Sequence, residues 1–278
     1  MRARELLLFG KKVLEAAGLP SAEAERESLL ILAYLLRIRP LEVYFYPEDV
    51  SPIQEQFQQI LTARKKKIPL AYLLGEVEFF GRSFEVAPGV LIPRPETEIL
   101  VEAVLQRLQG PAWILELGVG TGCVALTLAA EGGFYALGVE ISPRALAVAQ
   151  RNRQRLNLIQ KVHWVRGDWL APIKPGPRFE ALVSNPPYVS KAEWPELSPE
   201  VRLHEPREAL WGGEDGLDFI RKTLREAPWY LKPGGYVFLE IGYQQREQVA
   251  RLARELGYHV EFVKDLLGHA RVLVARRP

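Results

Sequence analysis

The sequence predicts an α/β protein in which a mostly parallel sheet, covered by helices on both faces, follows a small bundle of helices. Two observations lead to this fold class. From residue 112 onwards, short apolar runs of strand length alternate with helical stretches, a pattern that is typical of parallel sheets. Before residue 75, Leu, Ala, Glu, Lys and Gln recur with the spacing of helices that bury one face. The change near residue 75 therefore separates two structural regions.

The composition is that of a globular protein with hydrophobic cores, since 48% of its 278 residues are hydrophobic. The formal net charge of +2 gives no strongly basic field, so nucleic acid is not the expected partner. One cysteine and four scattered histidines provide neither a disulfide framework nor zinc-ligand spacing, and we expect no metal. No targeting segment or membrane-spanning run is evident, so we expect a cytoplasmic protein.

Local patterns divide the chain into three regions. Residues 1–74 are expected to form the helical bundle. In residues 75–92, alternating apolar and polar residues flank Gly81-Arg82-Ser83, which predicts a β-hairpin that links the two larger regions. Residues 93–278 are expected to form the α/β domain, and Pro93-Arg94-Pro95-Glu96-Thr97-Glu98 opens its first helix.

Seven strands are expected in the α/β domain. The last two are separated by too few residues for a crossover helix, so we expect this pair to be antiparallel in an otherwise mostly parallel sheet. The expected strands are residues 113–117, 135–139, 162–165, 179–184, 236–240, 260–263 and 272–274.

A glycine-rich loop, Gly118-Val119-Gly120-Thr121-Gly122, follows the first of these strands. Glycine lets the backbone approach a ligand closely, and the helix that begins near Cys123 has free N–H groups at its start. About 20 residues further on, at the end of the second strand, Glu140 has the spacing expected of an acid that binds ribose hydroxyls. We therefore predict a nucleotide or nucleoside site, and a solvated acid at a strand end is the alternative for Glu140.

The loop differs from a dinucleotide fingerprint. Gly-x-Gly-x-Gly lacks the x-x-Gly ending that accommodates a pyrophosphate, so a nucleoside without phosphates is favoured over NAD. Asp168 and Trp169 follow the third strand, where a carboxylate can accept a hydrogen bond from an adenine amino group and an indole can flank the base. Simple packing is the alternative for Trp169, and Cys123 is expected to be a packing residue rather than a nucleophile.

Asn185-Pro186-Pro187-Tyr188 follows the buried-looking strand of residues 179–184. Two prolines forbid further ladder hydrogen bonds, so the chain must leave the sheet here. The side-chain carbonyl of Asn185 and the freed carbonyl of Pro186 can accept hydrogen bonds from one NH2 group, and Tyr188 offers a ring face for stacking. These residues predict a site for a planar amide or amino nitrogen, whereas an ordinary turn after a strand is the alternative.

Further segments in the chain include Pro69-Leu70-Ala71-Tyr72-Leu73-Leu74-Gly75, Val90-Leu91-Ile92-Pro93 leading into Arg94-Pro95-Glu96-Thr97-Glu98, Glu205-Pro206-Arg207-Glu208-Ala209-Leu210, Gly212-Gly213-Glu214-Asp215-Gly216-Leu217 and Glu240-Ile241-Gly242. Together with the glycine loop and Asn185-Pro186-Pro187-Tyr188, these segments resemble the class I S-adenosylmethionine-dependent methyltransferases. More narrowly, they resemble the HemK/PrmC family of protein-glutamine N5-methyltransferases, which modify peptide chain release factors. The resemblance covers nearly the whole chain, and the order and joint presence of the segments make it specific.

The resemblance implies a Rossmann-like methyltransferase domain with a seven-stranded mixed sheet in residues 93–278, and it gives the bundle of residues 1–74 a role in partner recognition. S-adenosylmethionine is the implied cofactor and S-adenosylhomocysteine the product. Glu116 and Glu140 stand where the family commonly has Asp, which keeps the charge. The implied cofactor residues are Gly118, Val119, Gly120, Thr121, Gly122, Glu140, Asp168, Trp169 and Asn185, with Arg94 and Thr97 at the methionine end.

The implied reaction is methyl transfer to the glutamine nitrogen in the Gly-Gly-Gln motif of class 1 peptide chain release factors. Asn185, Pro186 and Tyr188 would be the catalytic residues and, together with Pro187, would hold the glutamine. Three alternatives stay open: a ribosomal-protein glutamine methyltransferase, an adenine-N6 methyltransferase of DNA or RNA, and a non-catalytic nucleotide-binding protein. The basic run from Arg64 to Lys67 is the one local patch that favours nucleic acid, and we expect it to be a solvated helix face.

Overall fold

The computed structural model describes residues 2–277, which form two compact units. One unit contains the described residues up to Gly75 together with Pro199–His204. The other contains Glu76–Ser198 and the described residues from Glu205 onwards.

The first unit consists of helices that pack around a core containing Leu6, Ile31 and Phe57. Gly10 allows a close approach in this core, because a Cβ atom added there would lie 2.5 Å from Cζ of Phe57. The elements of the unit are α1 (Ala3–Ala16), α2 (Ser21–Leu36), η1 (Pro40–Phe45), η2 (Ser51–Ile53), α3 (Gln54–Lys65), α4 (Leu70–Leu74) and α8 (Pro199–His204).

The expected solvated face at Arg64 is a wrong prediction. The Arg64 side chain is buried in the first unit, where its Nε and Nη2 donate to both carboxylate oxygens of Glu27 at 2.8 and 2.7 Å. Its Nη1 donates to the backbone oxygen of Ile68 at 2.5 Å. The guanidinium group is planar and suited to such forked pairing, so the buried acid on α2 holds it inside. Lys65 and Lys66 are exposed.

The short helix α8 belongs to the same compact unit as the N-terminal helices, whereas the sequence predicted that residues 93–278 form one α/β domain. Two polar contacts account for this: Nη2 of Arg64 donates to Glu200 at 3.2 Å, and Nε2 of His204 lies 3.4 Å from the backbone oxygen of Lys66. Local sequence patterns do not show such contacts, because their partners lie far apart in the chain.

The predicted hairpin forms, with β1 (Glu76–Phe79) antiparallel to β2 (Arg82–Glu85). Its turn is Phe80-Gly81 rather than the expected Gly81-Arg82-Ser83. Both turn residues have positive φ, 51° and 69°, as a two-residue type I′ turn requires. Phe79 and Phe84 pack into the core of the second unit, so the hairpin is part of that unit.

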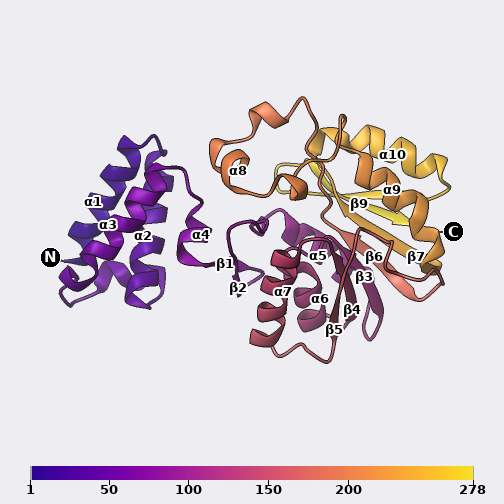
Figure 1. Ribbon diagram of the computed structural model, residues 1–278, viewed down its shortest axis with the longest axis horizontal. Helices are drawn as coiled ribbons and strands as arrows, with labels where there is room; N and C mark the ends of the chain where they lie inside the picture. Colours follow the sequence, from indigo (N-terminus) through magenta and orange to yellow (C-terminus); the bar gives the residue numbers. More distant parts are fainter. Residues whose placement is uncertain (1, 278) are drawn as a thin grey trace. The chain divides into compact units, whose positions relative to one another are not determined.

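The second unit contains the predicted seven-stranded mixed sheet, with the order β5-β4-β3-β6-β7-β9-β8 (Figure 1). The pairs from β5 to β7 are parallel, and both pairs that involve β9 are antiparallel, as expected for the last strands. The strands are β3 (Trp113–Leu117), β4 (Tyr135–Glu140), β5 (Val162–Arg166), β6 (Phe179–Ser184), β7 (Leu231–Glu240), β8 (His259–Lys264) and β9 (Ala270–Arg276).

Each face of the sheet has its own hydrophobic core. Ile114 packs on one face with residues of α5 and α6, whereas its neighbour Leu115 packs on the other with residues of α9 and α10 (Figure 1). This alternation follows from the two-residue repeat of a strand. The remaining elements are α5 (Thr97–Leu105), α6 (Cys123–Glu131), α7 (Pro143–Arg155), η3 (Trp194–Glu196), η4 (Arg207–Ala209), α9 (Asp218–Glu226), η5 (Ala227–Trp229), η6 (Tyr243–Gln245) and α10 (Arg246–Glu255).

None of the helices in residues 2–277 is both long enough and apolar enough to cross a membrane. Nor does this part of the chain bring together three or more His, Cys, Asp or Glu side chains in a group that could hold a metal ion.

Candidate functional site

The candidate site lies where β3 and β6 end side by side in the middle of the sheet. These strands are parallel, and their last residues, Leu117 and Ser184, are register partners. The Ser184 hydroxyl donates to the backbone oxygen of Leu117 at 2.6 Å, which ties the two strand ends together. After β3 the chain turns towards β4 and β5, whereas β6 begins the other half of the sheet. Ligands of open α/β sheets bind in the crevice at such a switch point.

The glycine loop leaves β3 in a backbone conformation that favours glycine. Gly118, Gly120 and Gly122 have φ values of 74°, 57° and 82°, which side chains with a Cβ rarely adopt. A Cβ at Gly118 would lie 4.0 Å from both the backbone oxygen of Asn185 and the Trp169 ring, so the loop runs close to both predicted sites. Helix α6 begins immediately after the loop.

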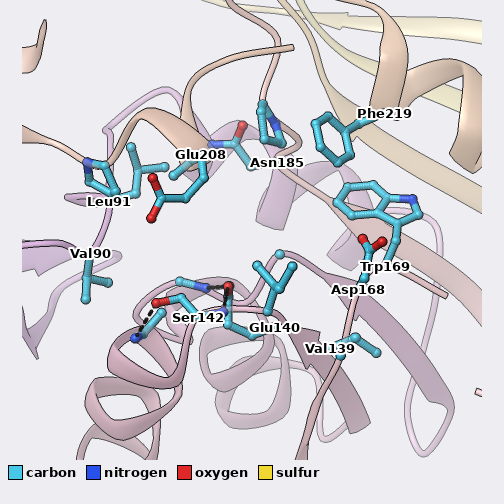
Figure 2. Close-up of a pocket in the computed structure, with 18 of the residues that line it drawn as sticks. Val90, Leu91, Val139, Glu140, Ser142, Asp168, Trp169, Asn185, Glu208 and Phe219 are labelled. Atoms are coloured by element: carbon cyan, nitrogen blue, oxygen red, sulfur yellow. Dashed lines mark hydrogen bonds between the residues drawn. The ribbon is translucent and has the colours of Figure 1, made fainter. Parts of the chain in front are cut away.

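Glu140 holds the shape of the glycine loop. Its Oε2 accepts a hydrogen bond from Gly120 N and its Oε1 accepts one from Ser142 N, both at 2.9 Å (Figure 2). Ser142 in turn caps α7 by accepting a hydrogen bond from Ala145 N at 3.3 Å. Each carboxylate oxygen keeps a lone pair for a ligand, so Glu140 can brace the loop and bind hydroxyl groups at once.

A pocket opens above this loop and brings together residues from distant segments (Figure 2). Of the predicted site residues, Gly118, Gly120, Glu140, Asp168, Trp169, Asn185 and Pro187 line it. Five other lining residues belong to the segments that carry the family resemblance, although no individual role was predicted for them. They are Val90, Leu91, Pro206, Glu208 and Ala209. Phe219 also lines the pocket and belongs to no quoted motif.

Trp169 and Phe219 form an aromatic wall at one end of the pocket (Figure 2). Their ring centroids are 4.8 Å apart, and the indole N–H donates to the Thr223 hydroxyl at 3.0 Å. Trp169 has a φ of 53°, an uncommon value for a residue with a large side chain. The neighbouring Asp168 side chain is 65% exposed, and its nearest cation is Lys222 Nζ at 4.0 Å. Its carboxylate is therefore accessible to a ligand.

A buried row of hydrogen bonds lies behind Asn185. The Asn185 NH2 group donates to the Thr97 hydroxyl oxygen at 3.0 Å, and that hydroxyl donates to Oε2 of Glu240 at 2.7 Å. The Tyr188 hydroxyl donates to the other carboxylate oxygen at 3.2 Å. Thr97 and Glu240 are 3% and 1% exposed, so water does not compete for these bonds. Because its NH2 group is engaged, Asn185 has its side-chain carbonyl oxygen free.

Burial shifts the ionisation of both acidic groups in this row. The pKa of Glu240 is raised to about 7 by burial, although the hydrogen bonds from Thr97 and Tyr188 oppose the shift. The pKa of the Tyr188 hydroxyl is also raised, by burial and by the nearby Glu240 carboxylate. Tyr188 therefore stays protonated and acts as a donor at neutral pH.

The other predicted site residues do not line the pocket. Val119 and Thr121 are buried within the loop, and Pro186 is buried beside Asn185. Arg94 pairs with Glu205, whose other carboxylate oxygen accepts a hydrogen bond from Ile92 N at 3.2 Å. The contacts of Arg94 and Thr97 with a cofactor stay predictions.

Burial shifts the ionisation of two further groups next to the loop, Cys123 and Glu116. Burial raises the pKa of the Cys123 thiol to about 12, which agrees with a packing role. Burial also raises the pKa of Glu116 well above its usual value, although its carboxylate accepts a hydrogen bond from Ala125 N at 3.3 Å.

Comparisons with known proteins agree with the arrangement of the chain. Residues 5–75 match a family model described as "PrmC N-terminal domain", and residues 114–204 match one described as "Methyltransferase domain".

Curated relatives match over the full length of the chain. The chain is 40% identical to a release factor glutamine methyltransferase of Koribacter versatilis, over 96% of this chain and 95% of the relative. It is 41% identical to the protein of the same name from Moorella thermoacetica, over 100% and 99%. A solved methyltransferase from Pyrococcus furiosus shares the fold, with a TM-score of 0.57 and 24% identity over 80% of this chain and 98% of that one.

The raised pKa of Glu240 predicts a specific pH dependence of stability. A carboxyl group whose pKa is higher in the folded than in the unfolded state stabilises the fold below the unfolded value, and this contribution is lost as pH rises through the folded value. Compared with Glu240→Gln, the wild-type free energy of unfolding should therefore fall between pH 4.5 and about 7 and then level off. The slope should reach about 1.4 kcal/mol per pH unit. Chemical denaturation of both proteins across this range measures it, and parallel curves would contradict the shifted pKa.

Proposed function

We propose that this chain methylates the side-chain amide nitrogen of a glutamine in a peptide chain release factor, because it belongs to the family of release factor glutamine methyltransferases. The family resemblance in the sequence is thereby confirmed, as is the α/β methyltransferase fold. Relatives that match nearly the full chain carry this name. We extend the proposal to the glutamine of the Gly-Gly-Gln motif in class 1 release factors, as the motifs implied.

The single observation that best supports the chemistry is the charge of the pocket. Three carboxylate residues, Glu140, Asp168 and Glu208, line it, and no Lys, Arg or His is among its lining residues in the described part of the chain, although Lys222 Nζ lies 4.0 Å from Asp168 outside the lining. A phosphate would meet three carboxylates of like charge in this lining, whereas a nucleoside that carries a positive sulfonium would meet opposite charge. The pocket residues therefore fit S-adenosylmethionine better than a nucleotide.

The proposed cofactor residues have roles that follow from their chemistry. S-adenosylmethionine supplies, when bound, a methyl group activated by a positively charged sulfur. Glu140 would accept hydrogen bonds from the ribose hydroxyls, and Asp168 would accept one from the adenine amino group. Trp169 would flank the adenine ring. The open backbone at Gly120, where an added Cβ would meet no atom within 4 Å, leaves room for a ligand.

Asn185 and Pro186 would hold the glutamine. An amide nitrogen is a poor nucleophile because its lone pair is delocalised, so orientation must supply much of the rate, and well-held reactants can gain about 7–11 kcal/mol. The Asn185 side-chain oxygen and the Pro186 backbone oxygen would accept the two N–H bonds of the glutamine and leave its lone pair facing the methyl group.

The same two oxygens would stabilise the charge that appears during transfer. As the new N–C bond forms, the C–S bond would break with its electron pair left on sulfur, so positive charge would pass to the glutamine nitrogen. Acceptor dipoles fixed before the reaction stabilise this charge without reorganisation. One N–H proton then leaves to water. The ring of Tyr188 would lie near the acceptor nitrogen in this proposal, where the negative face of an aromatic ring favours a developing positive charge.

Two further expectations belong to this proposal. The bundle of residues 1–74 is the region that we expect to recognise the release factor, because it holds none of the pocket residues. Release factors act in translation, so we expect the activity in the cytoplasm.

The proposal is tested by incubating the protein with radiolabelled S-adenosylmethionine and a class 1 release factor, a ribosomal protein or DNA. We expect label only in the release factor, with mass spectrometry locating the methyl group on the Gly-Gly-Gln glutamine. The Asn185→Ala variant should lose about 100-fold or more in single-turnover rate, the size of effect that follows loss of an aligned dipole. Label in the ribosomal protein or DNA alone, or an unchanged Asn185→Ala rate, would contradict the assignment.

Cofactor binding has its own test at Glu140. Calorimetry of Glu140→Ala should give an S-adenosylmethionine dissociation constant raised by about 10- to 100-fold, because hydrogen bonds to a charged group contribute about 1.5–3 kcal/mol. Glu247→Ala is a suitable control, since Glu247 is an exposed acid on α10 whose ion pair with Arg246 lies on the surface. Equal affinities of the two variants would remove Glu140 from the cofactor site.

A further inference from the structure

Thr97 and Glu240 form a buried connection behind Asn185 that methyl transfer, as described above, does not use. Their oxygens are 2.7 Å apart, although the residues are 143 positions apart in the sequence. Both lie outside the lining of the pocket. Glu240 ends β7, the strand next to β6, so its side chain reaches the segment that follows β6.

We propose that Thr97 and Glu240 are positioning residues that turn the Asn185 side chain so that its carbonyl oxygen, rather than its NH2 group, faces the acceptor glutamine. This inference rests on the proposed function, because it assigns the orientation of the group that receives the glutamine N–H bonds.

The orientation of the Asn185 amide is set by which groups can donate along the hydrogen bonds from Asn185 through Thr97 to Glu240. An ionised carboxylate can only accept hydrogen bonds, so Glu240 takes the single hydroxyl proton of Thr97. The Thr97 oxygen then has only lone pairs to offer Asn185, and at 3.0 Å it can accept only from the NH2 end. The Asn185 carbonyl oxygen is left for the pocket.

Without this constraint, the side-chain amide of Asn185 could adopt either of two orientations, related by a rotation of about 180°. The two ends of an amide are similar in size, and hydrogen bonding is what distinguishes them. In the reversed orientation the Asn185 NH2 group would meet the glutamine NH2 group, donor against donor. The glutamine would then lose one of its two acceptors, and its nitrogen would no longer be aligned with the methyl group.

Glu240 also fixes the other end of the Asn185–Tyr188 segment. Its Oε1 accepts from the Tyr188 hydroxyl at 3.2 Å. Gln245 adds to this by donating to the Tyr188 backbone oxygen at 3.0 Å and to Gly216 O at 3.2 Å. One carboxylate therefore holds both the amide and the aromatic ring that the reaction needs.

The hydrogen bonds among Asn185, Thr97 and Glu240 should change with pH, because Glu240 titrates near pH 7. Besides Thr97 and Tyr188, the charged groups that act on it are Glu96, which precedes α5 and raises its pKa, and Arg271 of β9, which lowers it. Protonation near pH 7 would let Glu240 donate to Thr97. The Thr97 proton could then turn to Asn185, which would favour the reversed amide. Turnover should therefore decline as pH falls below about 7.

Four variants separate positioning from a merely structural role. Thr97→Val removes the hydroxyl at nearly constant shape, whereas Thr97→Ser keeps it. Glu240→Gln still offers Thr97 a carbonyl acceptor but cannot titrate. Thr127→Val is a matched control, because Thr127 is also buried, in α6, and its hydroxyl has no hydrogen-bond partner among the described residues.

Three measurements are made on each full-length variant. Steady-state kinetics with a class 1 release factor gives kcat and KM between pH 5.5 and 9 (about the range in which Glu240 titrates). Calorimetry gives the S-adenosylmethionine dissociation constant and shows that the variant is folded. Nitrogen-15 NMR follows the Asn185 side-chain amide signals, assigned by their loss in Asn185→Ala, without any substrate present.

We expect Thr97→Val to lower kcat by about 100-fold, the cost of a small misplacement of a reacting group, with cofactor affinity close to that of wild type. Thr97→Ser should restore most of the loss, and Thr127→Val should resemble wild type. In Glu240→Gln, kcat should no longer decline as pH falls below about 7. The chemical shifts of the Asn185 amide signals should change with pH, with a midpoint near pH 7, in wild type and not in Glu240→Gln.

Other results would overturn the inference. Equal kcat values for Thr97→Val and Thr127→Val would remove the positioning role, and a loss confined to cofactor affinity would place Thr97 in the cofactor site instead. An acid-side decline that persists in Glu240→Gln would exclude Glu240. If wild type does not methylate the release factor at all, the proposed function fails, while the NMR titration still decides whether the row controls Asn185.

Discussion

The parallel pairing of β3 with β6 is the constraint on which the site depends. It places Leu117 opposite Ser184, and a hydrogen bond of 2.6 Å joins these strand ends. The glycine loop follows one strand and Asn185 follows the other. A cofactor bound at the loop and an acceptor nitrogen held at Asn185 would therefore be neighbours, as the proposed function requires. Prolines after Asn185 end the ladder at this point and free backbone oxygens for a guest.

Acidic groups in the site serve two different purposes. Glu140 and Asp168 face the pocket, and in the proposed function their charge favours a positively charged nucleoside over a phosphate. Glu240 lies behind the pocket and reaches Asn185 only through Thr97. Neither arrangement requires a strong base before the methyl group moves, because the nitrogen can lose its proton afterwards. In the proposed reaction, the orientation of hydrogen-bond acceptors would therefore matter more than the strength of a base.

Local sequence patterns were sufficient for the strands of the large sheet and for the loops that follow β3, β4 and β6, but not for the turn of the β1–β2 hairpin. All of the expected strands form, and the glycine loop, Glu140 and Asn185 meet at one pocket because each lies at the end of a parallel strand in the same sheet. The patterns could not reveal Phe219 in the wall, Arg64 buried against Glu27, or the bond between Thr97 and Glu240. These contacts join residues far apart in the chain, and periodicity carries no information about such pairs.

The most direct test of this account is a crystal structure of the protein with S-adenosylhomocysteine and a release factor that contains the Gly-Gly-Gln motif. The account predicts that the glutamine side-chain nitrogen lies about 3 Å from both the Asn185 side-chain oxygen and the Pro186 backbone oxygen, with its open face towards the sulfur. A glutamine bound elsewhere, or an Asn185 whose NH2 group faces the glutamine, would contradict it.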